Sequence, residues 1–274
     1  MNMIQNISKI STLRSQEMKV VILCGGMGTR LREETEYKPK PMVEIGNKPI
    51  LWHIMKKYSN HGFNDFVLCL GYKGDVIKDY FYNYKMRTHD ISISLATGDI
   101  QLHDSDEIEN WNVTLANTGL YSMTGARIKK IEKFIEDDTF MVSYGDGVTD
   151  LDISKLLAFH EKHGKIGTVT GVNPPSRYGE LILDGDSVVS FDEKPDTGVA
   201  PISGGYFIFN KAIFDYINNS DECVFEKEPL TNLAKDGELM VYHHNGFWQC
   251  MDTYRDCKFL NDMWNTGNAP WKVE

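Results

Sequence analysis

Residues 18–31, MKVVILCGGMGTRL, decide the fold. The run 18–24 is short, apolar and rich in β-branched residues, which predicts a buried strand. The run stops at Gly25, Gly26 and Gly28, and a cluster of glycines favours a change from strand to loop. Mononucleotide-binding folds begin in this way, so the stretch predicts an α/β architecture.

Helix and strand patterns alternate beyond this loop. Spacings typical of helices cover 49–60, 74–84, 124–135 and 153–163, and buried-strand runs cover 65–70, 140–144 and 166–172. Such alternation predicts a Rossmann-like three-layer sandwich, in which helices cover both faces of a mainly parallel sheet.

The second half of the chain is richer in short strands. They are expected over 181–183, 188–191 and 205–209, separated by Gly and Asp turns. The central sheet should therefore be mixed. Residues 95–118 are the least regular part and predict a long loop.

Composition excludes several classes of protein. The formal net charge of −10 disfavours nucleic acid as a partner, because that partner is held by many Lys and Arg side chains. No apolar run approaches the about 20 residues that a membrane helix needs, and residues 1–17 lack the apolar core of a signal peptide. We expect a flexible extension over 1–17 and a single domain over 18–274.

The five cysteines are odd in number and include no C-x-x-C pair. Neither a disulfide framework nor a zinc site is therefore predicted. A reducing compartment fits this cysteine usage, so the cytoplasm is the expected location.

The glycine-rich loop has two interpretations. Its backbone N–H groups can point into a common anion pocket, with Arg30 and Lys40 adding positive charge, or it is a tight turn after the first strand. The dinucleotide fingerprint G-x-G-x-x-G would need glycine at the position of Leu31, and the G-K-[ST] of a P-loop is absent. Both of those nucleotide-binding motifs are excluded.

The longer string around this loop is similar to a known family. Gly25-Gly26-x-Gly28-Thr29-Arg30-Leu31, followed by Lys40-Pro41-Met42 and Lys48-Pro49, resembles the signature of sugar-nucleotide pyrophosphorylases. The resemblance continues through Tyr144-Gly145-Asp146-Gly147, Glu193-Lys194-Pro195, Gly204-Gly205-Tyr206 and Met251-Asp252-Thr253. It covers nearly everything after Met18. It implies a GT-A-like nucleotidyltransferase fold and magnesium-dependent transfer of a nucleotidyl group to a sugar 1-phosphate, with release of pyrophosphate.

Other strings resemble the cytidylyltransferase branch of that family. They are KPKPMVEIGNKPILWHIMK at 38–56, WNVTLANTG at 111–119, SMTGARIKKI at 122–131, YGDG at 144–147 and GFWQCMDT at 246–253. This likeness implies CTP and glucose 1-phosphate as substrates and CDP-glucose as product, a precursor for deoxysugars or surface polysaccharides such as O-antigen. Two alternatives stay open: the same chemistry with another triphosphate or another sugar or polyol phosphate, and a catalytically silent homologue that binds nucleotide sugars.

The resemblance implies a role for each of four charged residues. The attacking phosphate is already anionic near neutral pH, so catalysis should rest on positioning and charge neutralisation. Arg30 and Lys40 are the expected catalytic cations, and Asp146 and Asp252 are the expected Mg²⁺ ligands. From the residues alone, Asp146 can be an ordinary turn aspartate and Asp252 the N-cap of a helix that begins near Thr253.

Two further sets are expected to bind the substrates. The nucleotide set is Leu23, Gly25, Gly26, Met27, Gly28, Thr29, Arg30, Thr124, Arg127 and Gly145. Thr124 and Arg127 open a helix whose free N–H groups can meet the nucleotide, and a simple N-cap is the alternative for Thr124. The sugar-phosphate set is Gly179, Glu193, Lys194, Gly204 and Gly205, where each glycine can equally serve a turn or bulge.

The resemblance also implies a homo-oligomer, with a hexamer as the implied assembly and the loop around Trp111 reaching a neighbouring subunit. From the residues alone, Trp111 and the segment 246–248 are core, sugar platform or subunit contact.

Overall fold

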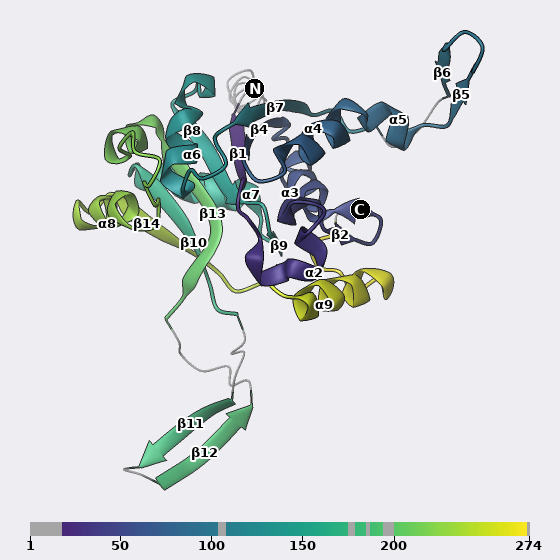
Figure 1. Ribbon diagram of the computed structural model, residues 1–274. Coiled ribbons are helices and arrows are strands. Elements are labelled where there is room, and N and C mark those ends of the chain that lie inside the picture. The colour runs from purple at the N-terminus through teal and green to yellow at the C-terminus, as the bar shows by residue number, and fades with distance from the viewer. Residues whose placement is uncertain (1–17, 104–107, 175–178, 185–186, 194–199, 273–274) are drawn as a thin grey trace, which may run out of the picture.

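The computed structural model describes residues 18–103, 108–174, 179–184, 187–193 and 200–272 (Figure 1). Its main sheet consists of β1 (Lys19–Cys24), β4 (Asp65–Leu70), β7 (Asn112–Asn117), β8 (Thr139–Tyr144), β10 (Gly167–Val172), β13 (Ile202–Asn210) and β14 (Leu239–His244). The strand order is β14-β10-β13-β8-β1-β4-β7. β13 runs antiparallel to both of its neighbours, and the other adjacent pairs are parallel. The predicted mixed, mainly parallel sheet is confirmed.

Helices lie on both faces of this sheet (Figure 1). The α-helices are α2 (Arg32–Thr35), α3 (Ile50–Ser59), α4 (Gly74–Tyr82), α5 (Tyr84–Thr88), α6 (Thr124–Lys130), α7 (Ile153–His163), α8 (Glu228–Lys235) and α9 (Tyr254–Asn265). Short 3₁₀ turns are η1 (Thr29–Leu31), η2 (Lys40–Met42), η3 (Glu132–Phe134) and η4 (Lys211–Tyr216).

Side chains of β1 alternate between two apolar cores, because successive residues of a strand point to opposite faces. Val20 and Ile22 pack with residues of α3 and α7 in one core, and Val21 and Leu23 pack with residues of α6 in the other. All four side chains are at most 9% exposed. Burial on both faces explains the continuous apolar run of this strand, and it confirms the three-layer arrangement.

Small antiparallel pairs complete the described structure. They are β2 (Glu44–Ile45) with β3 (Lys48–Pro49), β5 (Ile91–Ile93) with β6 (Ile100–Leu102), β9 (Gly147–Thr149) with β15 (Trp248–Cys250), and β11 (Gly179–Asp184) with β12 (Ser187–Glu193). Figure 1 shows the β5–β6 and β11–β12 hairpins projecting away from the main sheet. In the described part of the chain, no helix combines the length and the apolar character that a membrane crossing requires.

Two of the predicted segments are corrected. The stretch 95–118 is not one loop, because it contains β6 and the edge strand β7, which pairs in parallel with β4. β7 is only half-buried, so its sequence NVTLAN lacks the apolar run by which the central strands were found. The helix predicted over 124–135 ends at Lys130 and is followed by the 3₁₀ turn η3.

Candidate active site

The site lies at the carboxyl ends of β1 and β8. These strands are parallel neighbours, while β4 pairs with the other side of β1. The strand order therefore reverses at β1, because β4 and β7 are added on one side of it and β8 on the other. Ligands of open α/β sheets bind at such a switch point. The loop 25–28 follows β1 and Asp146 follows β8, so the topology brings them to one edge.

Four charged side chains from distant parts of the sequence meet at this edge. Lys40 Nζ donates to Asp146 Oδ2 over 2.7 Å and to Asp252 Oδ1 over 2.6 Å. Arg30 Nη1 donates to Asp252 Oδ2 over 2.8 Å. The structure therefore brings together the two predicted cations and the two predicted metal ligands.

Burial strengthens the electrostatics of this cluster. The Lys40 and Asp252 side chains are only 11% and 12% exposed, while the Arg30 side chain is 71% exposed. Burial alone would raise the pKa of Asp252, but the hydrogen bond and charge of Lys40, together with Arg30, hold that pKa below its usual value. Burial would likewise lower the pKa of Lys40, yet the two carboxylates raise it. Lys40 and Asp252 therefore favour the charged form of each other.

Asp252 is placed by a strand on one side and a helix on the other. Cys250 of β15 pairs with Gly147 of β9, and the backbone N–H of Met251 donates to Asp146 O over 2.8 Å. The N-cap of α9 is Thr253, which forms a capping box with Asp256. The N-cap alternative for Asp252 is therefore wrong, and its carboxylate faces the cations.

Lys40 is aimed by the short turn η2. Pro39 is extended, Pro41 stands in the first turn, and the backbone N–H of Val43 donates to Lys40 O. The nearby Lys38 forms an ion pair with Glu34 instead, and its Nζ lies 3.7 Å from Glu34 Oε2. Two lysines that are two residues apart thus have different surroundings.

A cavity of about 260 Å³ opens beside the charged cluster. It is lined by Arg30, Tyr144, Asp146, Gly147, Ser203, Gly204, Gly205, Tyr206, Trp248, Cys250 and Asp252. The indole N–H of Trp248 donates to Gly204 O over 2.7 Å, which fixes the ring against the glycine pair. Gly204 and Gly205 are thus at the cavity as predicted. Tyr144 belongs to a quoted family motif but to neither predicted binding set, and Ser203 was not singled out from the sequence.

Two further residues of the predicted sugar-phosphate set, Gly179 and Glu193, lie apart from this cavity. Gly179 and Glu193 pair across the β11–β12 hairpin, which stands away from the main sheet in Figure 1. Lys194 lies outside the described residues. Among the described residues of this set, the structure thus brings Gly204 and Gly205 to the cavity.

In the predicted nucleotide loop, residues 25–28, some positions pack against the protein and others face open space. A Cβ on Gly25 would lie 2.1 Å from Arg127 Nη1, and Gly28 has a φ of 62°, so both positions require glycine. A Cβ on Gly26 would meet no described heavy atom within 4 Å, and Met27 is 45% exposed. Thr29 is exposed in η1, where the turn closes with a bond from Leu31 N to Gly28 O.

The inner side of the loop rests on β1 and β8. A Cβ on Gly145 would lie 2.9 Å from Leu23 O and 3.1 Å from Pro41 Cγ. Glycine is therefore needed there for close packing between the strand ends. Leu23 itself is 9% exposed and belongs to an apolar core.

Arg127 supports the loop from behind. The side chain is buried, and its guanidinium donates to Gly25 O, Leu70 O, Gly119 O, Leu120 O and Thr118 Oγ1. These acceptors lie at or just after the carboxyl ends of β1, β4 and β7. Arg127 therefore joins three strand ends, and its donors are directed at protein oxygens in this arrangement, a placement that the sequence did not predict.

The N-terminus of α6 is closed by another part of the chain. The backbone N–H groups of Gly125 and Ala126 both donate to Cys223 O, over 2.9 and 3.2 Å. The N-cap is Met123, so the N-cap alternative for Thr124 is wrong. The Thr124 hydroxyl instead accepts from the backbone N–H of Phe225. The N–H groups expected to be free for a nucleotide are occupied by this segment.

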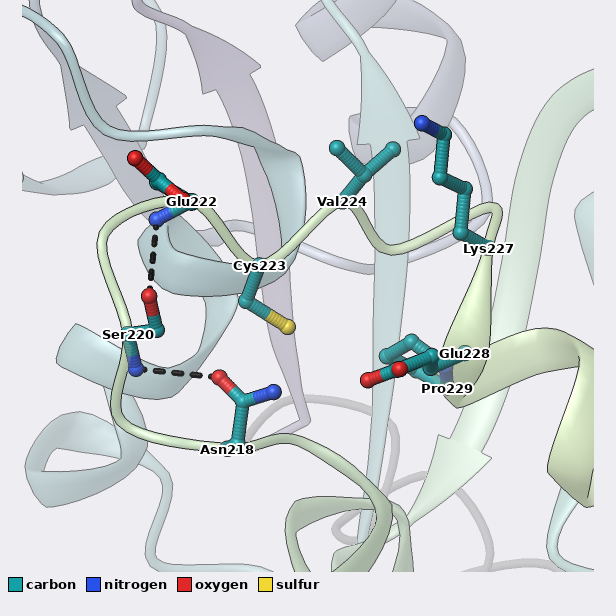
Figure 2. A pocket seen from close by; sticks show the side chains of 8 residues that line it. All are labelled: Asn218, Ser220, Glu222, Cys223, Val224, Lys227, Glu228 and Pro229. Atoms are coloured by element: carbon teal, nitrogen blue, oxygen red, sulfur yellow. Dashed lines mark hydrogen bonds between the residues drawn. The ribbon is translucent and has the colours of Figure 1, made fainter.

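That capping segment also forms a second cavity, which Figure 2 shows from close by. It is lined by Asn218, Ser220, Glu222, Cys223, Val224, Lys227, Glu228 and Pro229. The backbone N–H of Ser220 donates to Asn218 Oδ1, and that of Glu222 donates to Ser220 Oγ (Figure 2). Polar side chains of this wall therefore stabilise the loop itself.

The remaining expectations concern metals and thiols. Among the described residues, no group of three or more His, Cys, Asp or Glu side chains is arranged to hold a metal ion. All five cysteines lie in the described part, and they are thiols there rather than members of disulfides.

A switch-point cavity beside a Lys–Asp–Asp–Arg cluster suits a ligand with several phosphates. Comparisons with known proteins define the class of protein to which the chain belongs. Residues 19–256 match the model of the nucleotidyl transferase family, so the chain belongs to that family. It is 52% identical over 257 residues to glucose-1-phosphate cytidylyltransferase of Salmonella typhi, covering 93% of this chain and 99% of that one. It is 44% identical to the probable glucose-1-phosphate cytidylyltransferase of Bacillus subtilis, covering 93% and 100%.

A solved structure agrees with this membership. HddC from Yersinia pseudotuberculosis, complexed with GMP-PN, superposes with a TM-score of 0.66 at 27% identity, covering 90% of this chain and 99% of that one. The resemblance to nucleotidyltransferases that the sequence motifs indicated is confirmed.

The two adjacent glycines of the loop allow a matched test. We expect Gly25→Ala to lower the free energy of unfolding by about 1–3 kcal/mol, because the new methyl group overlaps the Arg127 guanidinium. Gly26→Ala should change it by less than about 0.5 kcal/mol, because its methyl group enters open space. Denaturant unfolding of both variants measures this difference, and equal losses would contradict the packing assigned to Gly25.

Proposed function

We propose that this chain transfers the cytidylyl group of CTP to α-D-glucose 1-phosphate and releases pyrophosphate. The observation that carries the proposal is the junction of Arg30, Lys40, Asp146 and Asp252 at the switch point of the sheet. The identity to the Salmonella typhi relative, over nearly the whole of both chains, supports the choice of base and sugar. The catalytically silent alternative is disfavoured, because all four charged groups are in place.

The mechanism requires little beyond positioning. The phosphate oxygen of the sugar phosphate attacks the α-phosphorus of CTP, a new P–O bond forms, and the bond to pyrophosphate breaks. Lys40 lies deepest and neutralises charge at the reacting phosphate, while the exposed guanidinium of Arg30 is free to reach the departing phosphates. The attacking group is already ionised, so no general base is needed.

Magnesium fits the carboxylate pair. Asp146 and Asp252 each place an oxygen within 2.7 Å of the same ammonium nitrogen, so the two carboxylates already converge on a position that holds positive charge. Mg²⁺ prefers oxygen ligands and commonly takes only one or two protein carboxylates. Asp146 and Asp252 would hold the ion, and when bound it supplies charge neutralisation for the phosphate oxygens.

Substrate selectivity is the direct test of the proposed function. We expect pyrophosphate release with glucose 1-phosphate and Mg²⁺ to be fastest with CTP when CTP, UTP, dTTP, GTP and ATP are compared. Removal of the divalent ion with a chelator should abolish release. Preference for another triphosphate, or for another sugar phosphate, would keep the chemistry and discard the assigned substrates, whereas binding without release would indicate the silent homologue.

The two lysines near the prolines provide a second test. Lys40→Ala should lower kcat on the order of 100-fold, because it removes a buried charge beside the reacting phosphate. Lys38→Ala should change kcat less than about twofold, because its ion pair with Glu34 is partly exposed. Steady-state kinetics of both variants distinguishes the two lysines, and equal effects would remove the role assigned to Lys40.

We also propose that the chain forms a homo-oligomer through the β5–β6 hairpin and works in the cytoplasm. Ile91 pairs with Leu102 and Ile93 with Ile100, so all four side chains lie on one face of the ribbon. Each is at least 37% exposed. An isolated hairpin is marginally stable, and cover from a second copy would bury this face. Trp111 packs on Trp52, Phe66 and Tyr84 of its own chain instead.

The hairpin proposal predicts a change in assembly. Ile93→Asp with Ile100→Asp should shift the protein to monomers in sedimentation velocity, because two charges would then lie on the apolar face. Gln101→Glu on the opposite face is the control and should leave the assembly intact. A monomeric unmodified protein, or an oligomer that withstands the double substitution, would overturn the proposal.

A further inference from the structure

We infer that Glu226 is a positioning residue of the active site, which holds the Tyr144 side chain in place as one wall of the cavity. Glu226 lies in the loop before α8 and is absent from the cavity lining and from the motifs that identify the family. The expected kinetic effects rest on the proposed function, whereas the contact between Glu226 and Tyr144 rests on geometry alone.

The Tyr144 ring occupies a constrained position. It lines the cavity two residues before Asp146, at the end of β8. A Cβ on Gly205 would lie 2.4 Å from Tyr144 Cδ2, so the ring lies directly against the Gly205 backbone. The Phe207 ring packs nearly perpendicular to it, with ring centroids 5.9 Å apart. Packing against Gly205 and Phe207 thus fixes the ring.

The Glu226 carboxylate holds the Tyr144 hydroxyl and accepts a second hydrogen bond from Thr124. The Tyr144 hydroxyl donates to Glu226 Oε1, and the Thr124 hydroxyl donates to Glu226 Oε2 over 2.7 Å. The Thr124 hydroxyl also accepts from the backbone N–H of Phe225 over 2.9 Å, which fixes the loop next to Glu226. Both carboxylate oxygens are therefore used, and an end of β8 is tied to the first turn of α6.

This tie joins the two halves of the site. Tyr144 belongs to the strand that presents Asp146, and α6 carries Arg127, whose guanidinium donates to Gly25 O in the nucleotide loop. Glu226 is absent from the cavity lining itself and meets that lining at Tyr144.

The part of the substrate that meets this wall follows from its chemistry. The charged cluster of Arg30, Asp146 and Asp252 suits phosphate groups and their counter-ion. The uncharged wall of Tyr144, Gly205 and Trp248 suits a sugar ring, whose C–H faces pack on aromatic rings and on backbone without side chains. Loss of the Glu226 contact should therefore weaken sugar phosphate binding more than turnover.

The test uses matched variants of the full-length enzyme. Glu226→Ala should raise KM for glucose 1-phosphate about tenfold and change kcat and KM for CTP less than about twofold. Glu226→Gln keeps an acceptor for Tyr144 and a donor for Thr124, and should raise that KM only about two- to threefold. Tyr144→Phe should match Glu226→Ala, and the double variant should be no worse than either single one.

A control and a second readout separate the outcomes. Glu222→Ala, in the second cavity of Figure 2, should leave all three kinetic constants unchanged. Ring-labelled tyrosine NMR should show the Tyr144 signal, identified by its loss in Tyr144→Phe, shifted in Glu226→Ala and not in Glu222→Ala. An unshifted signal, additive losses or a fall in kcat alone would overturn the inference. An inactive unmodified enzyme with the expected shift would overturn the proposed function and leave the positioning role supported.

Discussion

The ammonium group of Lys40 between two carboxylates is the interaction on which the arrangement of the site depends. Its partners, Asp146 and Asp252, are 106 and 212 residues away in the sequence. Like charges so close together would repel, and a buried lysine alone would lose its proton. The parallel pairing of β1 with β8 and the β9–β15 ladder hold the partners in register. These strand pairings thus bring Lys40, Asp146 and Asp252 together from distant parts of the sequence.

Arg127 provides the complementary support on the nucleotide side. A carbonyl oxygen can accept two hydrogen bonds, and the guanidinium adds a second donor to Gly25 O and Leu70 O, which also accept from the backbone N–H groups of Tyr72 and Thr118. The glycine at position 25 is thus explained by the guanidinium beside it, while Gly26 leaves space open to solvent. One glycine-rich string serves two purposes, packing on one side and ligand access on the other. Substitution tolerance should therefore differ between adjacent residues of the same loop.

Sequence patterns predicted the buried strands, but they did not predict the half-exposed edge strand or the contacts between residues that are distant in the sequence. β1, β4 and β8 were found because burial on both faces gives an unbroken apolar run, whereas β7 is half-exposed and reads as irregular. The charged cluster was predicted only as a set of separate motifs, since no spacing reveals that Lys40 meets Asp252. The closure of α6 by Cys223 was not predictable either, because a backbone carbonyl leaves no mark in the sequence.

The charged and the uncharged residues of the cavity come from different parts of this fold. The charged groups are held by short segments next to the central strands, and Lys40 and Asp252 favour the charged form of each other. The uncharged wall comes instead from one aromatic ring, a pair of glycines and an indole held by a backbone carbonyl. Changes in that wall alter its shape without removing a charge from the cluster. Under the proposed function, a substitution in that wall changes the contacts with the sugar while the charges that face phosphate stay in place, because the wall residues carry no charge.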